Sequence, residues 1–401
     1  MSSQPAAGHD AEHESMALVL EHLVSSGPVH ETGDQLLPGT AEHTAITPGP
    51  VSVQKHSKWW GRFFPGSLES AMDRLFASYH MGNYVAVRGQ PGQKIFESMP
   101  IYVRVGMHLL FYRSKEQSFL RYKSVEDLLK TVSVRQGKVY DDESNPQAVL
   151  EHIQSFIKTY SINLDELQQP DPSQYPNFNA FFYRKLKAGL RPIAEPENAS
   201  VVSSCADCRL TVFSDVAEAT KFWIKGDGFT LNRLVGDTNL ADRCFPPGSS
   251  IAIFRLAPAD YHRFHHPVGP SMCGPTKHIA GEYFTVNPQA VNADFDVFSG
   301  NRRDVLVLNW TPKGEAGPSI PVAFVAIGAM LVGSIGWTNA NQGSTVQRGD
   351  EAGYYAYGGS TNICVFPPEA KIEWDQDLLD NSKQGLETMV RAGDRIGISN
   401  A

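Results

Sequence analysis

Three short segments of the chain hold side chains that together could activate a serine. They are Ser203-Ser-Cys-Ala-Asp-Cys-Arg209, Leu256-Ala-Pro-Ala-Asp-Tyr-His-Arg-Phe-His-His-Pro267 and Gly358-Gly-Ser-Thr361. They supply a carboxylate, imidazoles and a hydroxyl. A histidine can take the proton of a serine hydroxyl while a carboxylate orients the ring and stabilises its charged form. Composition alone does not pair these groups, because geometry decides such sets.

Ser360 is the residue at which chemistry is expected first. It follows two glycines in a corner between two strand-like runs. Because neither glycine has a Cβ, the backbone before Ser360 can adopt angles that bring the hydroxyl toward the preceding carbonyl. A serine in such a corner can attack its own backbone.

The three segments resemble the motifs of the phosphatidylserine decarboxylase family. Asp207 matches the aspartate of a Ser-Pro-Ala-Asp-Gly-like segment, His265 ends the matching segment Asp260-Tyr-His-Arg-Phe-His265, and Ser360 matches the serine after Gly-Gly or Leu-Gly. Further matching segments are Phe178-Asn-Ala-Phe-Phe-Tyr-Arg-Lys-Leu-Lys187 with Arg191-Pro-Ile, Gly281-Glu-Tyr-Phe-Thr-Val-Asn-Pro288, Val346-Gln-Arg-Gly-Asp-Glu351 and Glu387-Thr-Met-Val-Arg-Ala-Gly393. The similarity covers residues 60–400, and its Gly-Gly-Ser-Thr form is closest to the eukaryotic extramitochondrial branch. Cys205 and Cys208 depart from the family's usual Pro and Gly, and Val-Gly-Pro after Pro267 is also unusual. These departures could reshape the substrate pocket, so the resemblance implies the type of reaction more firmly than the substrate.

The resemblance implies a proenzyme that cuts itself between Gly359 and Ser360. The β chain would be residues 1–359 and the α chain residues 360–401, a fragment of 42 residues. His265, oriented by Asp207, would take the Ser360 proton, and Ser360 would become a covalent pyruvoyl group. That cofactor would form a Schiff base with phosphatidylserine, releasing carbon dioxide and leaving phosphatidylethanolamine. No metal is implied.

Other residues and other functions stay open at this point. Tyr261, His262 and His266 are candidate substrate contacts; alternatively, His262 makes a structural hydrogen bond and His266 lies on a pocket wall or at the surface. A free amino acid such as tryptophan is the alternative substrate. A non-enzymatic scaffold, carrier-like or metal-binding, is the third hypothesis, in which Cys205-Ala-Asp-Cys208 would be half of a zinc or redox site, although no second CxxC follows.

Composition limits the class of protein. With 401 residues, 41% hydrophobic and 19% charged, the chain can bury a large core. Its formal charge of -8 argues against a nucleic-acid partner held by a broad basic surface. Five scattered cysteines are too few for a disulfide framework in so long a chain, which predicts a reducing compartment.

The pattern of residue types along the chain predicts an α+β fold with a helical N-terminal region packed on a β-rich catalytic unit. Residues 1–55 are acidic and rich in Ser, Thr, Gly and Pro, which predicts a disordered tail. Residues 56–195 read as mainly helical, with apolar residues spaced as in amphipathic helices at 68–76 and 149–157 and a proline-rich loop at 168–176. Residues 196–401 hold short β-rich runs at 250–254, 283–286, 305–310 and 322–327 and form the expected decarboxylase domain.

Targeting and membrane signals are few. The N-terminal segment matches neither a secretory signal nor a mitochondrial transit peptide. Residues 321–337 are uncharged but only 17 long and contain three glycines, so two buried strands are expected rather than a membrane span. The segment Trp59-Trp60-Gly-Arg-Phe-Phe64 is either an interfacial anchor for an anionic bilayer or part of the packing on the β-rich unit. A cytoplasmic location, or a peripheral one on an endomembrane, is expected.

Overall fold

The structure is a computed structural model of the 401-residue chain. It describes residues 82–90, 92–98, 137–224, 228–284, 296–314, 317–329, 334–356, 358 and 360–401. The acidic tail 1–55, the aromatic segment 59–64 and the helix expected at 68–76 lie outside the described residues.

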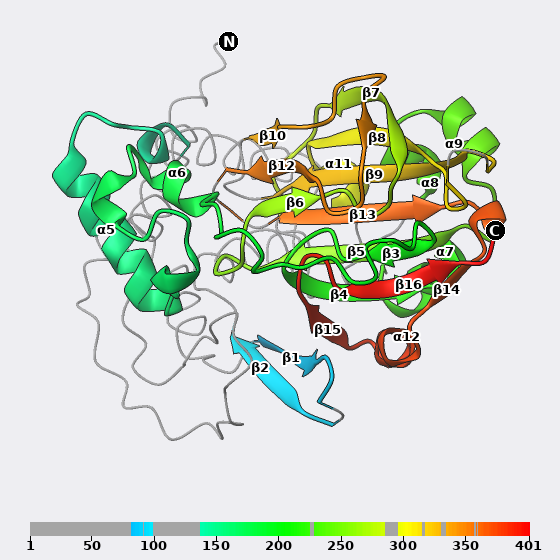
Figure 1. Ribbon diagram of the computed structural model, residues 1–401, viewed down its shortest axis with the longest axis horizontal. Coiled ribbons are helices and arrows are strands. Elements are labelled where there is room, and N and C mark those ends of the chain that lie inside the picture. Colours follow the sequence, from blue (N-terminus) through cyan, green and yellow to red (C-terminus); the bar gives the residue numbers. More distant parts are fainter. Residues whose placement is uncertain are drawn as a thin grey trace, which may run out of the picture.

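One ten-stranded sheet organises the described part of the chain (Figure 1). Its strands, in spatial order, are β11 (Thr345–Val346), β7 (Ser271–Ile279), β8 (Arg303–Trp310), β9 (Ile320–Gly328), β13 (Ser360–Phe366), β5 (Ser250–Leu256), β4 (Cys208–Phe213), β15 (Glu387–Val390), β1 (Gly82–Val87) and β2 (Lys94–Ser98). All neighbours in this sheet are antiparallel except β1 and β15, which run parallel.

Strand β13 lies near the middle of this sheet and is buried along its whole length. Successive side chains of a strand point to opposite faces of the sheet. Accordingly, Ile363 and Val365 join one hydrophobic core and Cys364 and Phe366 join another. The continuous apolar run Ile363-Cys-Val-Phe366 is therefore explained by a strand that is covered on both faces.

Two small sheets lie on the second of these cores. One has the order β10 (Ile335–Trp337), β12 (Glu351–Tyr355), β6 (Arg263–His265), and the other the order β14 (Ile372–Trp374), β16 (Arg395–Ser399), β3 (Val201–Ser203). Phe264 of β6 and Tyr355 of β12 contribute buried rings to that core. The histidine segment and the Ser360 strand are thus brought to the same core.

The helices pack mainly on the first core. They are α5 (Pro146–Tyr160), α6 (Phe178–Phe182), α7 (Val216–Phe222), α8 (Leu231–Val235), α9 (Thr238–Cys244), α11 (Val297–Gly300) and α12 (Gln376–Lys383), with 3-10 turns η2 (Leu164–Glu166), η3 (Pro172–Gln174) and η4 (Pro368–Ala370). Helix α5 begins at an Asn145 cap and buries Ile153 and Phe156, which confirms the helical spacing of its sequence. Figure 1 places α5 and α6 together at one end of the β-rich unit. The expected α+β class is confirmed.

The hairpin of β1 and β2 differs from the expected helical character of residues 56–195. Its β1 strand pairs with β15, whose residues are about 300 positions further along the chain. The spacing of apolar residues within residues 56–195 could not predict this pairing. Residues 320–328 form the buried strand β9 and residues 335–337 the half-buried β10, as expected for two strands. Among the described residues, no helix has both the length and the apolar character needed to span a bilayer.

Candidate active site

Ser360 is the first residue of β13 and is fully buried. It pairs with Leu256 of β5 on one side and Gly328 of β9 on the other. The Ser360 hydroxyl has no hydrogen-bond partner among the described residues. Gly358, two residues earlier, has φ of 134°, a conformation that favours glycine, as the sequence predicted for this corner. Gly359 lies outside the described residues.

The strand opposite Ser360 is held by Asn301. The Nδ2 amide of this buried residue donates to the carbonyl of Gly328 at 2.9 Å and to that of Phe284 at 2.8 Å. Its Oδ1 accepts from the backbone N–H of Phe284 at 2.9 Å. Asn301 thereby fixes the end of β9 against which Ser360 lies.

His262 is a fully buried, neutral imidazole. Its Nδ1 lies 2.9 Å from the carbonyl oxygen of Asp260, which can only accept, so Nδ1 carries the proton and Nε2 carries a free lone pair. Nε2 has no hydrogen-bond partner among the described residues. Burial lowers the pKa of His262 to about 3, and the ring packs on Phe182 with centroids 4.0 Å apart. The structural hydrogen bond expected for His262 is present.

The turn before His262 is fixed by Asp260. Its carboxylate accepts from the backbone N–H of Ala257 at 2.7 Å and forms a buried ion pair with Arg209 of β4. Arg209 in turn binds Glu97 of β2 at 2.7 Å. The histidine segment is therefore tied both to the main sheet and to the β1–β2 hairpin.

His265 is oriented by a backbone carbonyl. Its Nδ1 lies 2.9 Å from the oxygen of Gly349, so Nδ1 donates and Nε2 is left as a base without a hydrogen-bond partner in the described structure. Burial lowers the pKa of His265, while the nearby carboxylates of Glu351 and Asp207 oppose this effect. The backbone N–H of His265 donates to Cys205 at 2.7 Å, which brings β6 beside the Asp207 segment.

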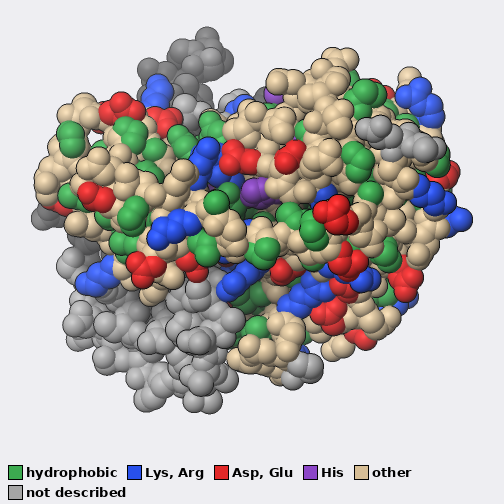
Figure 2. All heavy atoms as spheres, in the orientation of Figure 1, with side chains coloured by type: hydrophobic (Ala, Val, Ile, Leu, Met, Phe, Trp, Pro, Cys, Tyr) green, Lys and Arg blue, Asp and Glu red, His purple; other side chains and the backbone are tan. Residues whose placement is uncertain are grey.

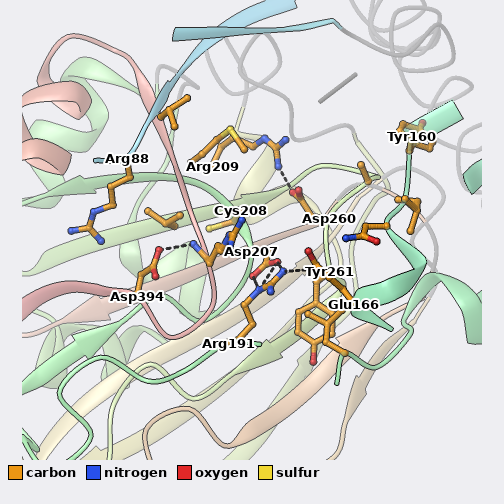
Figure 3. Close-up of a pocket in the computed structure, with 18 of the residues that line it drawn as sticks. Arg88, Tyr160, Glu166, Arg191, Asp207, Cys208, Arg209, Asp260, Tyr261 and Asp394 are labelled. Carbon is orange, nitrogen blue, oxygen red and sulfur yellow. Dashed lines mark hydrogen bonds and ion pairs between the residues drawn. The ribbon is translucent and has the colours of Figure 1, made fainter. Parts of the chain in front are cut away.

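Asp207 is held by an arginine and a backbone amide. Arg191 Nε lies 2.9 Å from both carboxylate oxygens and Nη2 lies 2.6 Å from Oδ2, while the N–H of Ala392 donates to Oδ1 at 2.9 Å. Figure 3 shows Arg191 directed at Asp207, with Glu166 beside it, and Glu166 forms an ion pair with the same guanidinium at 3.3 Å. Asp207 makes no hydrogen bond to His265, since both ring nitrogens of His265 are accounted for above.

His266 makes a structural contact. Its Nε2 lies 2.7 Å from the carbonyl oxygen of Asn339, and its backbone N–H donates to Asp350. The side chain is 1% exposed, so the surface alternative considered for it is wrong. Burial also lowers the pKa of this histidine.

A cavity of about 180 Å³ adjoins the Asp207 segment. Its walls come from the chain after α5, the β1–β2 hairpin, the turn before His262 and the ends of β4 and β15; Asp207 and Tyr261 both line it (Figure 3). The Tyr261 ring also lies 5.7 Å from that of His265. Ser360, His262, His265 and His266 are not among the lining residues.

Arg184 is a buried cation in the wall of this cavity that the sequence did not single out as a site residue. Its guanidinium donates to the backbone carbonyls of Phe182, Ala259 and Asp260 at 3.2, 2.9 and 3.3 Å. Burial lowers the pKa of Arg184 to about 10. Four further lining arginines surround the space, namely Arg88, Arg191, Arg209 and Arg391.

Charge over the rest of the molecule is mixed. The face in Figure 2 carries acidic and basic side chains interspersed, without a broad basic area on it. Among the described residues, no group of three or more His, Cys, Asp or Glu side chains is placed to hold a metal ion. Cys205 and Cys208 are both buried, and burial raises the pKa of each thiol.

Comparisons with a family model and with individual known proteins point to the same family. The family described as phosphatidylserine decarboxylase matches residues 178–398. Phosphatidylserine decarboxylase proenzyme 3 of Schizosaccharomyces pombe is 43% identical over 308 residues, covering 77% of this chain and 30% of that protein. Proenzyme 2 of Oryza sativa is 44% identical over 291 residues, covering 72% and 44%.

A bacterial relative is covered more completely. The proenzyme of Fusobacterium nucleatum is 37% identical over 247 residues, which are 62% of this chain and 78% of that protein. The chain spans less than half the length of the fungal and plant relatives above. The match of the family over more than half of the chain, together with the identity to the bacterial proenzyme, assigns the chain to the phosphatidylserine decarboxylase family.

Proposed function

We propose that this chain is a proenzyme that cuts itself between Gly359 and Ser360 and then decarboxylates phosphatidylserine. The observation that carries the proposal is the buried Ser360 hydroxyl, which has no hydrogen-bond partner among the described residues. The backbone of Gly358 lies beside the ring of His262 and acts on its pKa. A buried hydroxyl without competing hydrogen bonds, two residues after a glycine whose backbone acts on a buried imidazole, suits a nucleophile. The proenzyme names of the relatives support the same reading.

The cut would use groups of the chain itself. His265 Nε2 takes the proton of the Ser360 hydroxyl, and the oxygen attacks the carbonyl carbon of Gly359. The Gly359–Ser360 C–N bond breaks as a C–O ester bond forms, and the proton passes to the amide nitrogen. Elimination then releases the Gly359 carboxyl group and leaves a C=C bond at residue 360. One water enters and one ammonia leaves to give the N-terminal pyruvoyl group.

Asp207 would act on this step through its charge. Its carboxylate raises the pKa of His265 against the effect of burial, and so favours the imidazolium that forms when the ring takes a proton. The orientation of the ring would come from the Gly349 carbonyl rather than from Asp207. Arg191 and Ala392 hold the carboxylate in place. Asp207 is thus proposed as an electrostatic partner.

The pyruvoyl group supplies a carbonyl that can condense with a substrate amine and accept the electron pair released by decarboxylation. Residue 360 fits this group, because it lies at the start of a fixed central strand and is shielded from water. His262 and His265 each keep an Nε2 lone pair that could accept and return a proton. These two imidazoles are the proposed proton carriers of the later reaction.

The cavity supports an anionic substrate. Arg184 is a buried guanidinium whose hydrogen bonds go to backbone carbonyls, and a buried cation gains from an added anionic group. Phosphatidylserine carries a phosphodiester and a carboxylate that such a group could bind. Tyr261 lines this cavity and stays the proposed substrate contact.

The experiment has two parts. Mass spectrometry of the purified chain should find a 42-residue fragment that begins with a pyruvoyl group in place of Ser360, and Ser360→Ala should stay at 401 residues. Release of carbon dioxide is then measured with phosphatidylserine vesicles and, separately, with free amino acids including tryptophan. Release from the vesicles alone supports the proposal. Release from an amino acid alone would replace the lipid substrate, and an uncut wild-type chain would refute the enzymatic reading.

Contact with a bilayer surface follows from a lipid substrate and is part of the same proposal, with a cytoplasmic or endomembrane-peripheral location. The aromatic and basic residues of the segment 55–64 are the proposed anchor. Flotation with anionic vesicles should recover the full chain and lose it after deletion of residues 1–66. Equal recovery of both proteins would remove the anchor from the proposal.

A further inference from the structure

Tyr355 links the two sides of the proposed cut. It lies five residues before Ser360, at the end of β12, and is fully buried. Its hydroxyl lies 3.1 Å from the carbonyl oxygen of Thr361 and 2.6 Å from Oδ1 of Asn362, both of which follow the cut. After cleavage these contacts would join the end of the β chain to the start of the α chain.

The same residue is bound to the histidine segment. The backbone N–H of Tyr355 donates to the carbonyl of His262 at 3.0 Å. Its ring packs on Phe264 of β6 with centroids 5.0 Å apart. Tyr355 therefore contacts His262 through its backbone and the residue after Ser360 through its hydroxyl. A tyrosine side chain has only two main torsions, so this connection is stiff.

The hydroxyl of Tyr355 is a donor at any ordinary pH. Burial raises the pKa of Tyr355, so the phenol stays protonated. Asn362, which accepts from it, points to the same face of β13 as Ser360 because the two are two residues apart in a strand. The neighbours of Asn362 across the sheet are Phe254 and Ala326, which are apolar. An amide in such surroundings needs the hydrogen bond that Tyr355 supplies.

We infer that Tyr355 is a positioning residue for self-cleavage, which holds the start of β13 against the segment of His262 and His265 through its hydroxyl at the Thr361 carbonyl and its backbone N–H at the His262 carbonyl. The inference rests on the self-cleavage proposed above. The phenol has a single proton, for which Asn362 Oδ1 and the Thr361 carbonyl oxygen compete as acceptors. Ser360 Oγ and His265 Nε2, the two groups of the proposed proton transfer, are both without hydrogen-bond partners in the described structure, and they lie on the two segments that Tyr355 connects.

The test follows cleavage of the full chain after cell-free synthesis. Tyr355→Phe keeps the ring and removes the hydroxyl, and should slow the appearance of the 42-residue fragment by about tenfold, the effect of one well-placed hydrogen bond. Asn362→Leu should cleave within about twofold of the wild type, because it removes the competing acceptor and leaves the phenol proton to the Thr361 carbonyl. Tyr354→Phe is the matched control; its ring packs on Tyr183 instead, and it should cleave normally.

A double variant separates positioning from folding. Tyr355→Phe alone leaves Asn362 Oδ1 buried without its donor and should lower the unfolding temperature, whereas Tyr355→Phe with Asn362→Leu removes both partners and should restore it. If the double variant regains the wild-type unfolding temperature but still cleaves slowly, positioning is supported, because the Thr361 carbonyl still lacks its donor. Cleavage restored together with stability, or a wild-type rate in Tyr355→Phe, overturns the inference. A wild-type chain that stays uncut refutes the proposed function instead.

Discussion

Acid should destabilise this fold through His262. Burial lowers the pKa of His262 to about 3, and Arg184 and Arg209 add to this effect, while the backbone of Asp260 and Gly358 opposes it. In the unfolded chain the ordinary pKa of 6.5 applies. Below pH 6.5 the unfolded state therefore binds a proton at His262 that the folded state does not bind. The free energy of unfolding decreases as the pH is lowered.

The size of the effect follows from the gap between the two pKa values. The contribution of neutral His262 is fully present above pH 6.5 and is lost progressively as the pH falls toward the folded pKa of about 3. Each pH unit in this window is worth about 1.36 kcal/mol. Between pH 6.5 and about pH 5, His262 alone should remove ~2 kcal/mol from the free energy of unfolding.

Urea denaturation of the uncut Ser360→Ala chain measures this loss. The same chain with His262→Gln has no titrating group at this position, so subtracting its pH profile removes the contributions of His265 and His266, whose pKa values burial also lowers. The difference between the two proteins should be constant above about pH 7 and should change by ~2 kcal/mol by about pH 5. Parallel profiles over the whole range would show that His262 is not a buried neutral group.

Three further predictions concern the site and its supports. His265→Ala should slow formation of the 42-residue fragment by about 10²- to 10⁴-fold in mass spectrometry of freshly made chain, the usual contribution of a general base; unchanged cleavage would assign that role elsewhere. Arg191→Met should cost ~3 kcal/mol in urea denaturation because it leaves the Asp207 carboxylate buried without its cation. Arg395→Met should cost less than ~1 kcal/mol, because this side chain is half-exposed and its partner Asp375 keeps Arg88; equal losses would contradict this. Glu97→Gln should speed hydrogen exchange in β1 and β2, because this carboxylate binds two buried arginines of the main sheet; unchanged exchange would mean that the hairpin is held by β15 alone.

Much of the fold could be predicted from local patterns. The helix at 146–160 and the strands at 250–256, 303–310 and 320–328 follow from spacing and residue type. The β1–β2 hairpin could not be predicted in this way, because its parallel partner β15 is distant in sequence. Its attachment through Glu97 also depends on two arginines in other strands. Local periodicity carries no information about such partners.

Parts of the candidate site could be predicted from the sequence, and other parts could not. The corner before Ser360 could be predicted, because two successive glycines permit the φ of 134° that Gly358 adopts. The orientation of His265 could not, since its partner is the backbone carbonyl of Gly349, a group that every residue type provides. Arg191 belonged to a recognised motif, but its pairing with Asp207 becomes visible only in three dimensions.

The distribution of unsatisfied polar atoms points to the site independently of any relative. A buried donor or acceptor without a partner typically costs about 1–3 kcal/mol, so folds retain few of them. In the described structure, such atoms include the Nε2 atoms of His262 and His265 and the hydroxyls of Ser360 and Thr361. These four belong to two short segments that Tyr355 joins by hydrogen bonds. Stability alone would favour apolar side chains at these positions, and unmatched polar groups in these two segments are what the self-cleavage proposed at Ser360 requires.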